Sequence, residues 1–318
     1  MAHEIETMAY VNAKPWHNLG VELSTNQPIE VWQKQSGMNF TIKDAPVQFS
    51  TNLTGHEAVS SFPEQKVLYR SDTGAPLSIV SARYQIVQPS EILEFYRDLT
   101  EIAGFELETA GVMKGGRKLW ALARTHQSSS VKGNDLMHAY LLLATGCDGT
   151  LATTAQFTSI RVVCNNTLAI SLDEGENAIK VPHNTRFNAA AVKQQLDISI
   201  PSWDNFMHRM KVLSNRQLKI SEADKLLERI FSDANSASEK QKNARAMKSV
   251  QTLYEGHGKG AELSSSKSTA FGLLNAVTQF VDHERRARND DYRRDSAWFG
   301  QGANLKQKAF DQVWQLVE

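Results

Sequence analysis

The chain has 318 residues, of which 41% are hydrophobic and 22% are charged, and its 35 basic and 35 acidic side chains give a formal net charge of zero. This length and apolar content suit one large or two modest soluble domains and exclude a disordered chain. The neutral balance excludes a protein that attracts polyanions over its whole surface, so any attraction to phosphate requires local patches of cations.

The cysteine content and the hydropathy of the chain indicate in which cellular compartment the protein is expected. Cys147 and Cys164 are too far apart for a Cys-x-x-Cys pair and too few for a disulfide framework. The acidic N-terminus has no apolar core of signal-peptide length, and no later stretch approaches the roughly 20 apolar residues that span a bilayer. We therefore expect a cytoplasmic protein.

Residues 1–60 carry scattered aromatic and turn-forming side chains, which predicts an arm packed on the core. A short helix is expected at 29–36. Residues 40–49 alternate like a strand, and Pro46 indicates that this strand lies at a sheet edge, because proline cannot donate to a β-ladder.

Residues 61–200 have the pattern of an α+β sheet domain. The turn at 71–74 predicts a hairpin, and a helix is expected from an N-cap at Ser90 to a stop at Gly104. Strands are then expected at 105–113, 118–124, 137–144 and 150–159. Residues 160–170 could extend the last strand or begin a helix.

Residues 201–318 are rich in helix formers, which predicts a mainly helical region. Apolar stripes occur at 223–231, 244–254 and 271–281, and the glycine- and serine-rich stretch 256–266 between the last two predicts a mobile loop. The fold class is therefore α+β, with an antiparallel, hairpin-rich sheet crossed by a helix and followed by helices.

No motif in the sequence predicts a catalytic, metal or cofactor site. Lys267-Ser268 lacks the preceding glycine of a phosphate loop, and we expect Ser268 to cap the next helix. His283-Glu284 lacks the second histidine of a zinc helix, which favours a surface position for His283. Cys164 lies in an apolar run typical of core packing, whereas Cys147 lies in a turn beside Asp148.

Cations gather in three places, and each place has a plain structural alternative. Lys114, Arg117 and Lys118 crowd an expected hairpin tip, where they could meet phosphates or simply keep the turn soluble. Lys242, Arg245 and Lys248 recur at three-residue spacing, which places them on one ridge of a helix. A solvated helix face would explain that ridge equally well.

The densest basic run comprises Arg285, Arg286 and Arg288, followed by Arg293 and Arg294, with Tyr292, Trp298 and Phe299 close by. Arginine binds phosphates, and aromatic rings stack on unpaired bases at about 1–3 kcal/mol per base. The acids Asp290, Asp291 and Asp295 offer the alternative of ion pairing. We add Arg161 to these cations as a candidate nucleic-acid contact.

Four segments together resemble one known family; their residue numbers are 1–10, 15–20, 161–168 and 296–309. They read MAHEIETMAY, PWHNLG, RVVCNNTL and SAWFGQGANLKQKA. The chain is thereby similar, over nearly its whole length, to the phage/plasmid-like family that contains domain of unknown function 932. This resemblance implies an origin in prophages, phages or plasmids and no particular chemistry.

The expected order of strands and helices also resembles that of ring-forming strand-annealing recombination proteins, which implies architecture and class only. We therefore expect a non-enzymatic, homo-oligomeric protein that binds single-stranded DNA in recombination or replication, without cofactor or metal. One alternative is an interaction protein that blocks a host factor. Another is a nucleic-acid-processing enzyme, for which Asp148, His183 and His283 are the candidate residues.

Overall fold

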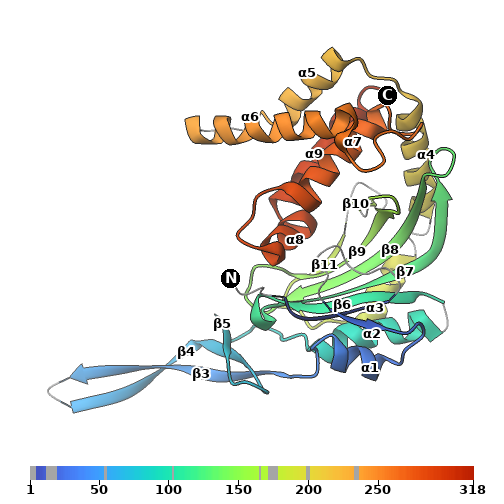
Figure 1. The fold of residues 1–318 in the computed structure, drawn as a ribbon. Helices are drawn as coiled ribbons and strands as arrows, with labels where there is room; N and C mark the ends of the chain where they lie inside the picture. Colours follow the sequence, from blue (N-terminus) through green and yellow to red (C-terminus); the bar gives the residue numbers. More distant parts are fainter. Residues whose placement is uncertain are drawn as a thin grey trace. The chain divides into compact units, whose positions relative to one another are not determined.

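The computed structural model describes residues 5–11, 20–53, 56–101, 104–164, 166–170, 178–197, 201–232 and 236–318. The fold is α+β, as predicted (Figure 1). The chain forms two compact units. Unit 1 contains Met1–Arg124, Leu141–Gln156 and Ala178–Asp197, and unit 2 contains Thr125–Tyr140, Phe157–Asn177 and Ile198–Glu318. No helix among the described residues is long and apolar enough to cross a bilayer.

The larger sheet has the strand order β10-β9-β8-β7-β6-β1-β2, with β11 paired to β9. Its strands are β1 Ile5–Val11, β2 Val21–Leu23, β6 Glu106–Met113, β7 Lys118–Ser130, β8 Leu136–Gly146, β9 Thr153–Arg161, β10 Asn166–Ala169 and β11 Ile179–Val181. The expected hairpin pairing of β6 with β7 is antiparallel, as are the pairings of β1 with β6 and of β9 with β10, whereas β1 and β2 run parallel.

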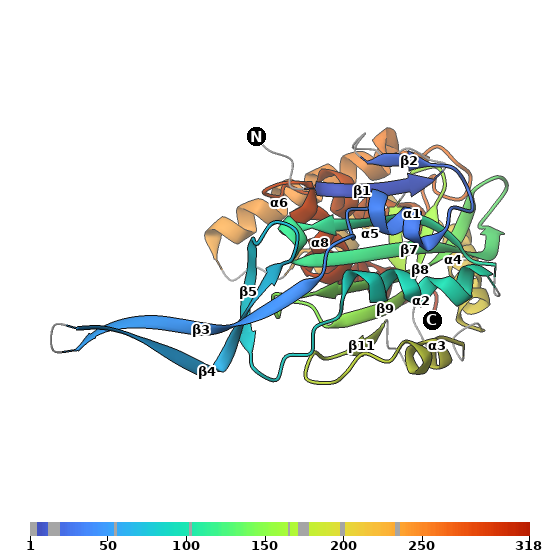
Figure 2. The same ribbon diagram turned by 90° about the horizontal axis from the view of Figure 1, so that it is seen from below.

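The smaller sheet belongs to unit 1 and has the order β3-β4-β5, formed by Ile42–Leu53, His56–Arg70 and Pro76–Ser81. The predicted hairpin between β4 and β5 is confirmed. The predicted edge strand is also confirmed, and its Pro46 lies where the register of β3 against β4 shifts. Beyond β5, the two strands β3 and β4 continue as a two-stranded ribbon (Figures 1 and 2).

Unit 1 has three α-helices among its described residues: α1 Ile29–Gln35, α2 Pro89–Glu101 and α3 Ala189–Asp197. The apolar stripe predicted for α2 is buried, including Phe95 and Tyr96. The Tyr96 hydroxyl lies 2.9 Å from the carbonyl oxygens of both Ala121 and Leu141, which ties α2 to the sheet. Helices α1 and α2 pack against each other (Figure 2).

The segment 160–170 forms the end of one strand and the whole of the next. Arg161 ends β9 and pairs with Asn166, which begins β10. The helical alternative for this segment is therefore wrong. Thr167 and Leu168 pair with Ile160 and Ser159 of β9, so their backbone groups are satisfied in the ladder.

Unit 2 carries the helices α4 Pro201–Asn215, α5 Ile220–Ile230, α6 Ala237–Thr252, α7 Ala270–Gln279, α8 Asp290–Phe299 and α9 Gln301–Trp314. Two π-helical turns, η3 Leu253–His257 and η4 Phe280–Glu284, follow α6 and α7. The stripes predicted for α5 and α7 are buried. In the stripe predicted at 244–254, Val250 and Leu253 are buried, Met247 and Tyr254 are half-buried, and Ala244 is exposed.

Two expectations about the segment before α7 are wrong. The stretch 256–266 is not a mobile loop throughout, because Ser265 and Ser266 are buried and hydrogen-bonded. The N-cap of α7 is Thr269 instead of Ser268: its hydroxyl accepts a hydrogen bond from the Gly272 amide at 3.0 Å. Ser268 has φ +57°, outside the extended conformation typical of an N-cap.

Candidate nucleic-acid interface

Lys242, Arg245 and Lys248 lie along one side of α6, and all three are exposed. We call them the α6 ridge. None of them forms an ion pair with any residue that the structure describes. The helix begins at Ser236, whose hydroxyl accepts from the Glu239 amide at 3.2 Å. Because the first turns bury little, this cap and the helix propensity of the sequence stabilise α6 more than packing does.

A second group of cations, the arginine segment, consists of Arg285, Arg286 and Arg288 after η4. Arg286 and Arg288 are exposed, and the Arg288 guanidinium lies 5.6 Å from the centroid of the Tyr292 ring. This distance suits a cation–π contact, which leaves the guanidinium edge open to an anion.

Arg285 is half-buried and incompletely paired. Its Nη2 donates to Gln301 Oε1 at 3.2 Å, whereas its Nη1 is buried and has no hydrogen-bond partner among the residues that the structure describes. Burial lowers the pKa of Arg285, and no carboxylate among the described residues pairs with it. An anion at this site would therefore meet a donor that is already desolvated.

The alternative of ion pairing holds for part of the basic run. Arg293 pairs with Asp290 at 2.9 Å and donates from Nε to the Arg285 carbonyl at 3.0 Å. Arg294 lies over Trp298, 5.7 Å from the ring centroid. These side chains stabilise α8, whereas Arg286 and Arg288 extend into solvent.

The α6 ridge and the arginine segment belong to the same part of unit 2. Helix α6 packs against α7 and against η4, and the arginine segment begins directly after η4 (Figure 1). The structure thus brings these six predicted contacts onto neighbouring elements.

The hairpin tip in unit 1 differs from the expectation. The hairpin itself is confirmed, but Lys118 is only 3% exposed and Lys114 is half-buried. The tip lies against the smaller sheet: a Cβ placed on Gly116 would come within 3.2 Å of side-chain atoms of Arg70 and Leu77. Arg117 alone of the three keeps an exposed side chain, so they form no cationic tip.

The prediction that Arg161 contacts nucleic acid is wrong for this structure. The side chain is 1% exposed and cannot reach a phosphate. Its Nε and Nη2 donate to Asp135 Oδ1 and Oδ2 at 2.8 and 2.7 Å. Nη2 donates also to Ser266 Oγ at 2.8 Å. The arginine therefore holds β9 to the loop before α7, and its role in this structure is internal.

Lys306 and Asp282 form a second buried ion pair, which the sequence did not predict. Lys306 Nζ lies 2.8 Å from Asp282 Oδ1 and 2.9 Å from the Thr167 carbonyl. Asp282 accepts from the Thr167 amide at 2.7 Å. Because these groups are 24 and 139 residues from Lys306 in the chain, local patterns give no signal for the cluster.

Two of the three residues considered for enzymatic chemistry, Asp148 and His183, contact other side chains. Asp148 accepts from the amide and hydroxyl of Thr150. His183 stacks on Tyr84 with the ring centroids 4.4 Å apart. His283 is half-buried and not on the surface as expected, since it follows the buried end of α7.

Both thiols are buried. Burial, reinforced by Asp148, raises the pKa of Cys147 to about 12. Cys164 is buried in the core, which confirms the predicted packing role, and this burial raises the pKa of its thiol. Among the described residues, no three His, Cys, Asp or Glu side chains are grouped so that they could hold a metal ion.

No curated protein and no solved structure matches the chain. A family model does match: that of the domain of unknown function DUF932, over residues 76–298. This region includes β5, most of the larger sheet, the α6 ridge and the arginine segment. The chain therefore belongs to the DUF932 family.

Proposed function

We propose that unit 2 binds single-stranded DNA through the α6 ridge and the arginine segment. The protein would act without catalysis, as a homo-oligomer, in strand annealing during recombination or replication of a phage or plasmid. The cytoplasm is the proposed compartment, since both cysteines are free thiols.

The α6 ridge is the observation that carries this function. Its three cations are exposed, lie on one side of a helix and have no ion-pair partner among the described residues. In a chain of zero net charge, such unneutralised cations supply the local field that attracts a polyanion. Contacts of this kind go to the phosphates and leave the base edges accessible for pairing.

The arginine segment would extend the contact. Arg285 has a desolvated donor with no carboxylate partner in the part of the chain that the structure describes, and a phosphate would provide an acceptor. Arg286 and Arg288 offer forked donors, which hold phosphate oxygens in two places at once.

Fluorescence anisotropy with a labelled single-stranded oligonucleotide tests the function. The variant Lys242→Gln/Arg245→Gln/Lys248→Gln should weaken binding about tenfold or more at about 50 mM salt and lower the salt slope by about 2. The matched control Lys43→Gln/Arg83→Gln/Lys180→Gln removes the same charges from exposed positions in unit 1 and should bind like the wild type. Absence of binding by the wild type, or equal losses in both variants, would refute the function.

The β3–β4 ribbon supports a second candidate, a protein-interaction role that blocks a host factor. Phe49, Val59 and Phe62 are 46%, 67% and 40% exposed, and they lie on the part of β3 and β4 that extends beyond the pairing with β5. Exposed apolar side chains on a ribbon are typical of interaction surfaces. Co-purification of a stoichiometric host protein without nucleic acid, lost in the variant Phe49→Ser/Phe62→Ser, would favour this role over DNA binding.

A further inference from the structure

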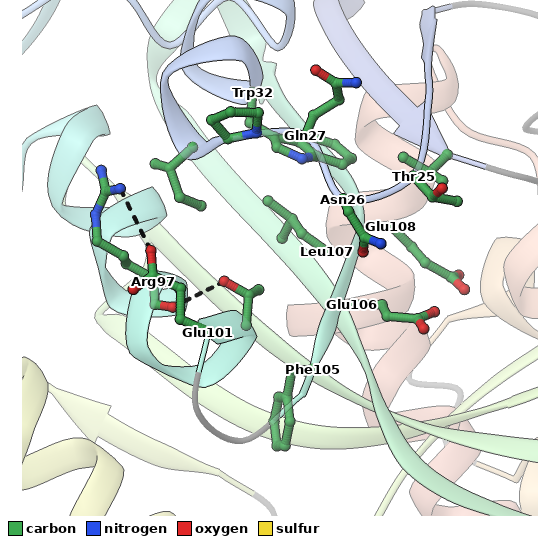
Figure 3. A pocket seen from close by; sticks show the side chains of 14 residues that line it. Thr25, Asn26, Gln27, Trp32, Arg97, Glu101, Phe105, Glu106, Leu107 and Glu108 are labelled. Atoms are coloured by element: carbon green, nitrogen blue, oxygen red, sulfur yellow. Dashed lines mark hydrogen bonds and ion pairs between the residues drawn. The ribbon is translucent and has the colours of Figure 1, made fainter.

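The cavity shown in Figure 3 lies in unit 1, has a volume of about 380 Å³ and is lined in part by charged side chains. Two of its carboxylates have basic partners: Glu101 pairs with Arg97 at 3.9 Å, and Glu106 pairs with Arg124 at 3.2 Å. Among its described lining residues, none has a buried side-chain nitrogen or oxygen atom without a hydrogen-bond partner. A much smaller cavity in unit 2 differs in this respect.

The smaller cavity lies between the β9–β10 hairpin and helix α7, and its volume is about 10 Å³. One of its walls is a single face of α7, where four lining residues recur at helical spacing: Phe271, Leu274, Asn275 and Thr278. Met137, Leu168 and Met210 add apolar side chains, each at most 7% exposed. A cavity of about 10–15 Å³ is the smallest that holds one water molecule.

Arg161 and Asn166 supply the polar wall of this cavity. They lie directly opposite each other in the ladder of β9 and β10, so their side chains share one face of the hairpin. Their exposed fractions are 1% and 4%. Each has one buried atom without a hydrogen-bond partner among the described residues: Nη1 of Arg161 and Oδ1 of Asn166. The first atom can only donate, and the second can only accept.

The other polar atoms of these two side chains are engaged. Nε and Nη2 of Arg161 donate to Asp135 at 2.8 and 2.7 Å. Nδ2 of Asn166 donates to the Asn275 carbonyl at 3.2 Å, which identifies the remaining amide atom as the oxygen. Burial raises the pKa of the neighbouring Cys164 thiol and Arg161 opposes this rise, but a thiol sulfur is a weak acceptor. A buried donor and a buried acceptor therefore remain to be satisfied, and leaving them so costs free energy.

We propose that this cavity binds one structural water molecule. The water would accept a hydrogen bond from Arg161 Nη1 and donate one to Asn166 Oδ1. Its second proton would go to Thr278 Oγ1, a buried hydroxyl that itself donates to the Asn275 carbonyl at 3.0 Å and can still accept. Three hydrogen bonds are typical of a buried water, and these three would join the β9–β10 hairpin to α7.

The chemistry of the two atoms distinguishes water from other small occupants. A chloride ion could accept from Arg161, but it could not donate to Asn166, and it would add a negative charge near Asp135, the counter-ion of Arg161. An ammonium ion could donate to Asn166 but would lie beside a guanidinium. An apolar occupant would leave both atoms without a partner. The site thus requires a small neutral molecule that donates and accepts.

A high-resolution crystal structure of the full-length protein tests the site directly. We expect one ordered water within about 3.2 Å of both Arg161 Nη1 and Asn166 Oδ1. A direct hydrogen bond between these two atoms, an ion at this position, or no occupant beside two unpaired atoms would overturn the proposal.

Magnetic relaxation dispersion of the solvent nuclei tests it in solution, because this method counts the water molecules that a protein holds inside it. Asn166→Leu removes the acceptor and should lower the count by one. The control Asn205→Leu makes the same change at an exposed position of α4 and should leave the count unchanged. An equal count in the wild type and in Asn166→Leu would overturn the proposal.

A milder variant keeps the test valid if Asn166→Leu does not fold. Thr278→Val preserves the shape of the side chain and removes the third partner, so the water should exchange about fivefold faster or more. The control Thr100→Val loses the same kind of bond, from a hydroxyl to the carbonyl three residues earlier, on α2 and away from the cavity. An exchange rate in Thr278→Val no faster than in Thr100→Val would contradict the three-bonded water. The water site does not rest on DNA binding, which the α6 ridge variant tests separately.

Discussion

Asp135 and Arg161 form a buried, two-pronged ion pair in which each side chain is 1% exposed. Their two hydrogen bonds measure 2.8 and 2.7 Å, and Ser265 donates a further short bond to Asp135. Because Arg161 ends β9 and Ser265 precedes α7, the pair joins the sheet to the helices of unit 2. It also removes from solvent a cation that the sequence suggested for DNA.

Breaking this pair should destabilise the protein strongly. Asp135→Asn leaves Arg161 as a buried charge without its counter-ion, and we expect a loss of about 3–5 kcal/mol in the free energy of unfolding, measured by urea denaturation. The control Asp98→Asn removes the partner of Lys193 at a largely exposed site and should cost less than about 1 kcal/mol. Similar losses in the two variants would contradict an internal role for Arg161.

The cap of α7 gives a finer test. Thr269→Ala removes the acceptor for the Gly272 amide and should cost about 1–2 kcal/mol. Ser268→Ala changes an exposed side chain and should stay within about 0.5 kcal/mol of the wild type. A larger loss from Ser268→Ala than from Thr269→Ala, in the same denaturation assay, would return the cap to the position that the sequence suggested.

His283 should make stability depend on pH. Burial lowers its pKa below the usual value of 6.5, and Asp282 opposes that shift only in part. Between the folded pKa and about 6.5 the unfolded chain binds more protons, so this contribution to stability is complete above that range and decreases as the pH falls through it. His283→Gln should therefore reduce the change in unfolding free energy between about pH 7.5 and pH 5. An unaltered pH profile would show that His283 does not contribute to it.

The thiols should resist modification in the folded protein. Cys147 and Cys164 are 5% and 2% exposed, and burial raises the pKa of both. Because the thiolate is the reactive form, a thiol-specific chromogenic reagent at neutral pH should label neither until denaturant is added. Rapid labelling of Cys147 in the native state would revive a nucleophilic role for it.

Local patterns in the sequence were sufficient for most of the secondary structure. The turn at 71–74, the stripe of α2 and the glycine-containing turn before Lys118 each depend on residues that are close in the chain, and all three elements are present. The parallel pairing of β1 with β2 was not foreseen, since a three-residue strand carries almost no periodicity.

The candidate nucleic-acid interface could be predicted from the sequence only where the local structure determines whether a side chain is exposed. Three-residue spacing placed the α6 ridge on one helix side, and its exposure agrees with that placement. Spacing could not distinguish Arg288, which is exposed, from Arg161, which is buried, because the partner that neutralises Arg161 is 26 residues away. Charge alone does not reveal where a side chain lies.

The sequence by itself determined the α+β class, the order of hairpins and helices, and which surfaces of the helices are polar, because these properties follow from periodicity and turn chemistry. Only the tertiary structure decided which cations are neutralised inside the protein. Those outcomes depend on contacts between residues far apart in the chain, and the free energy of burying a charge depends on such contacts.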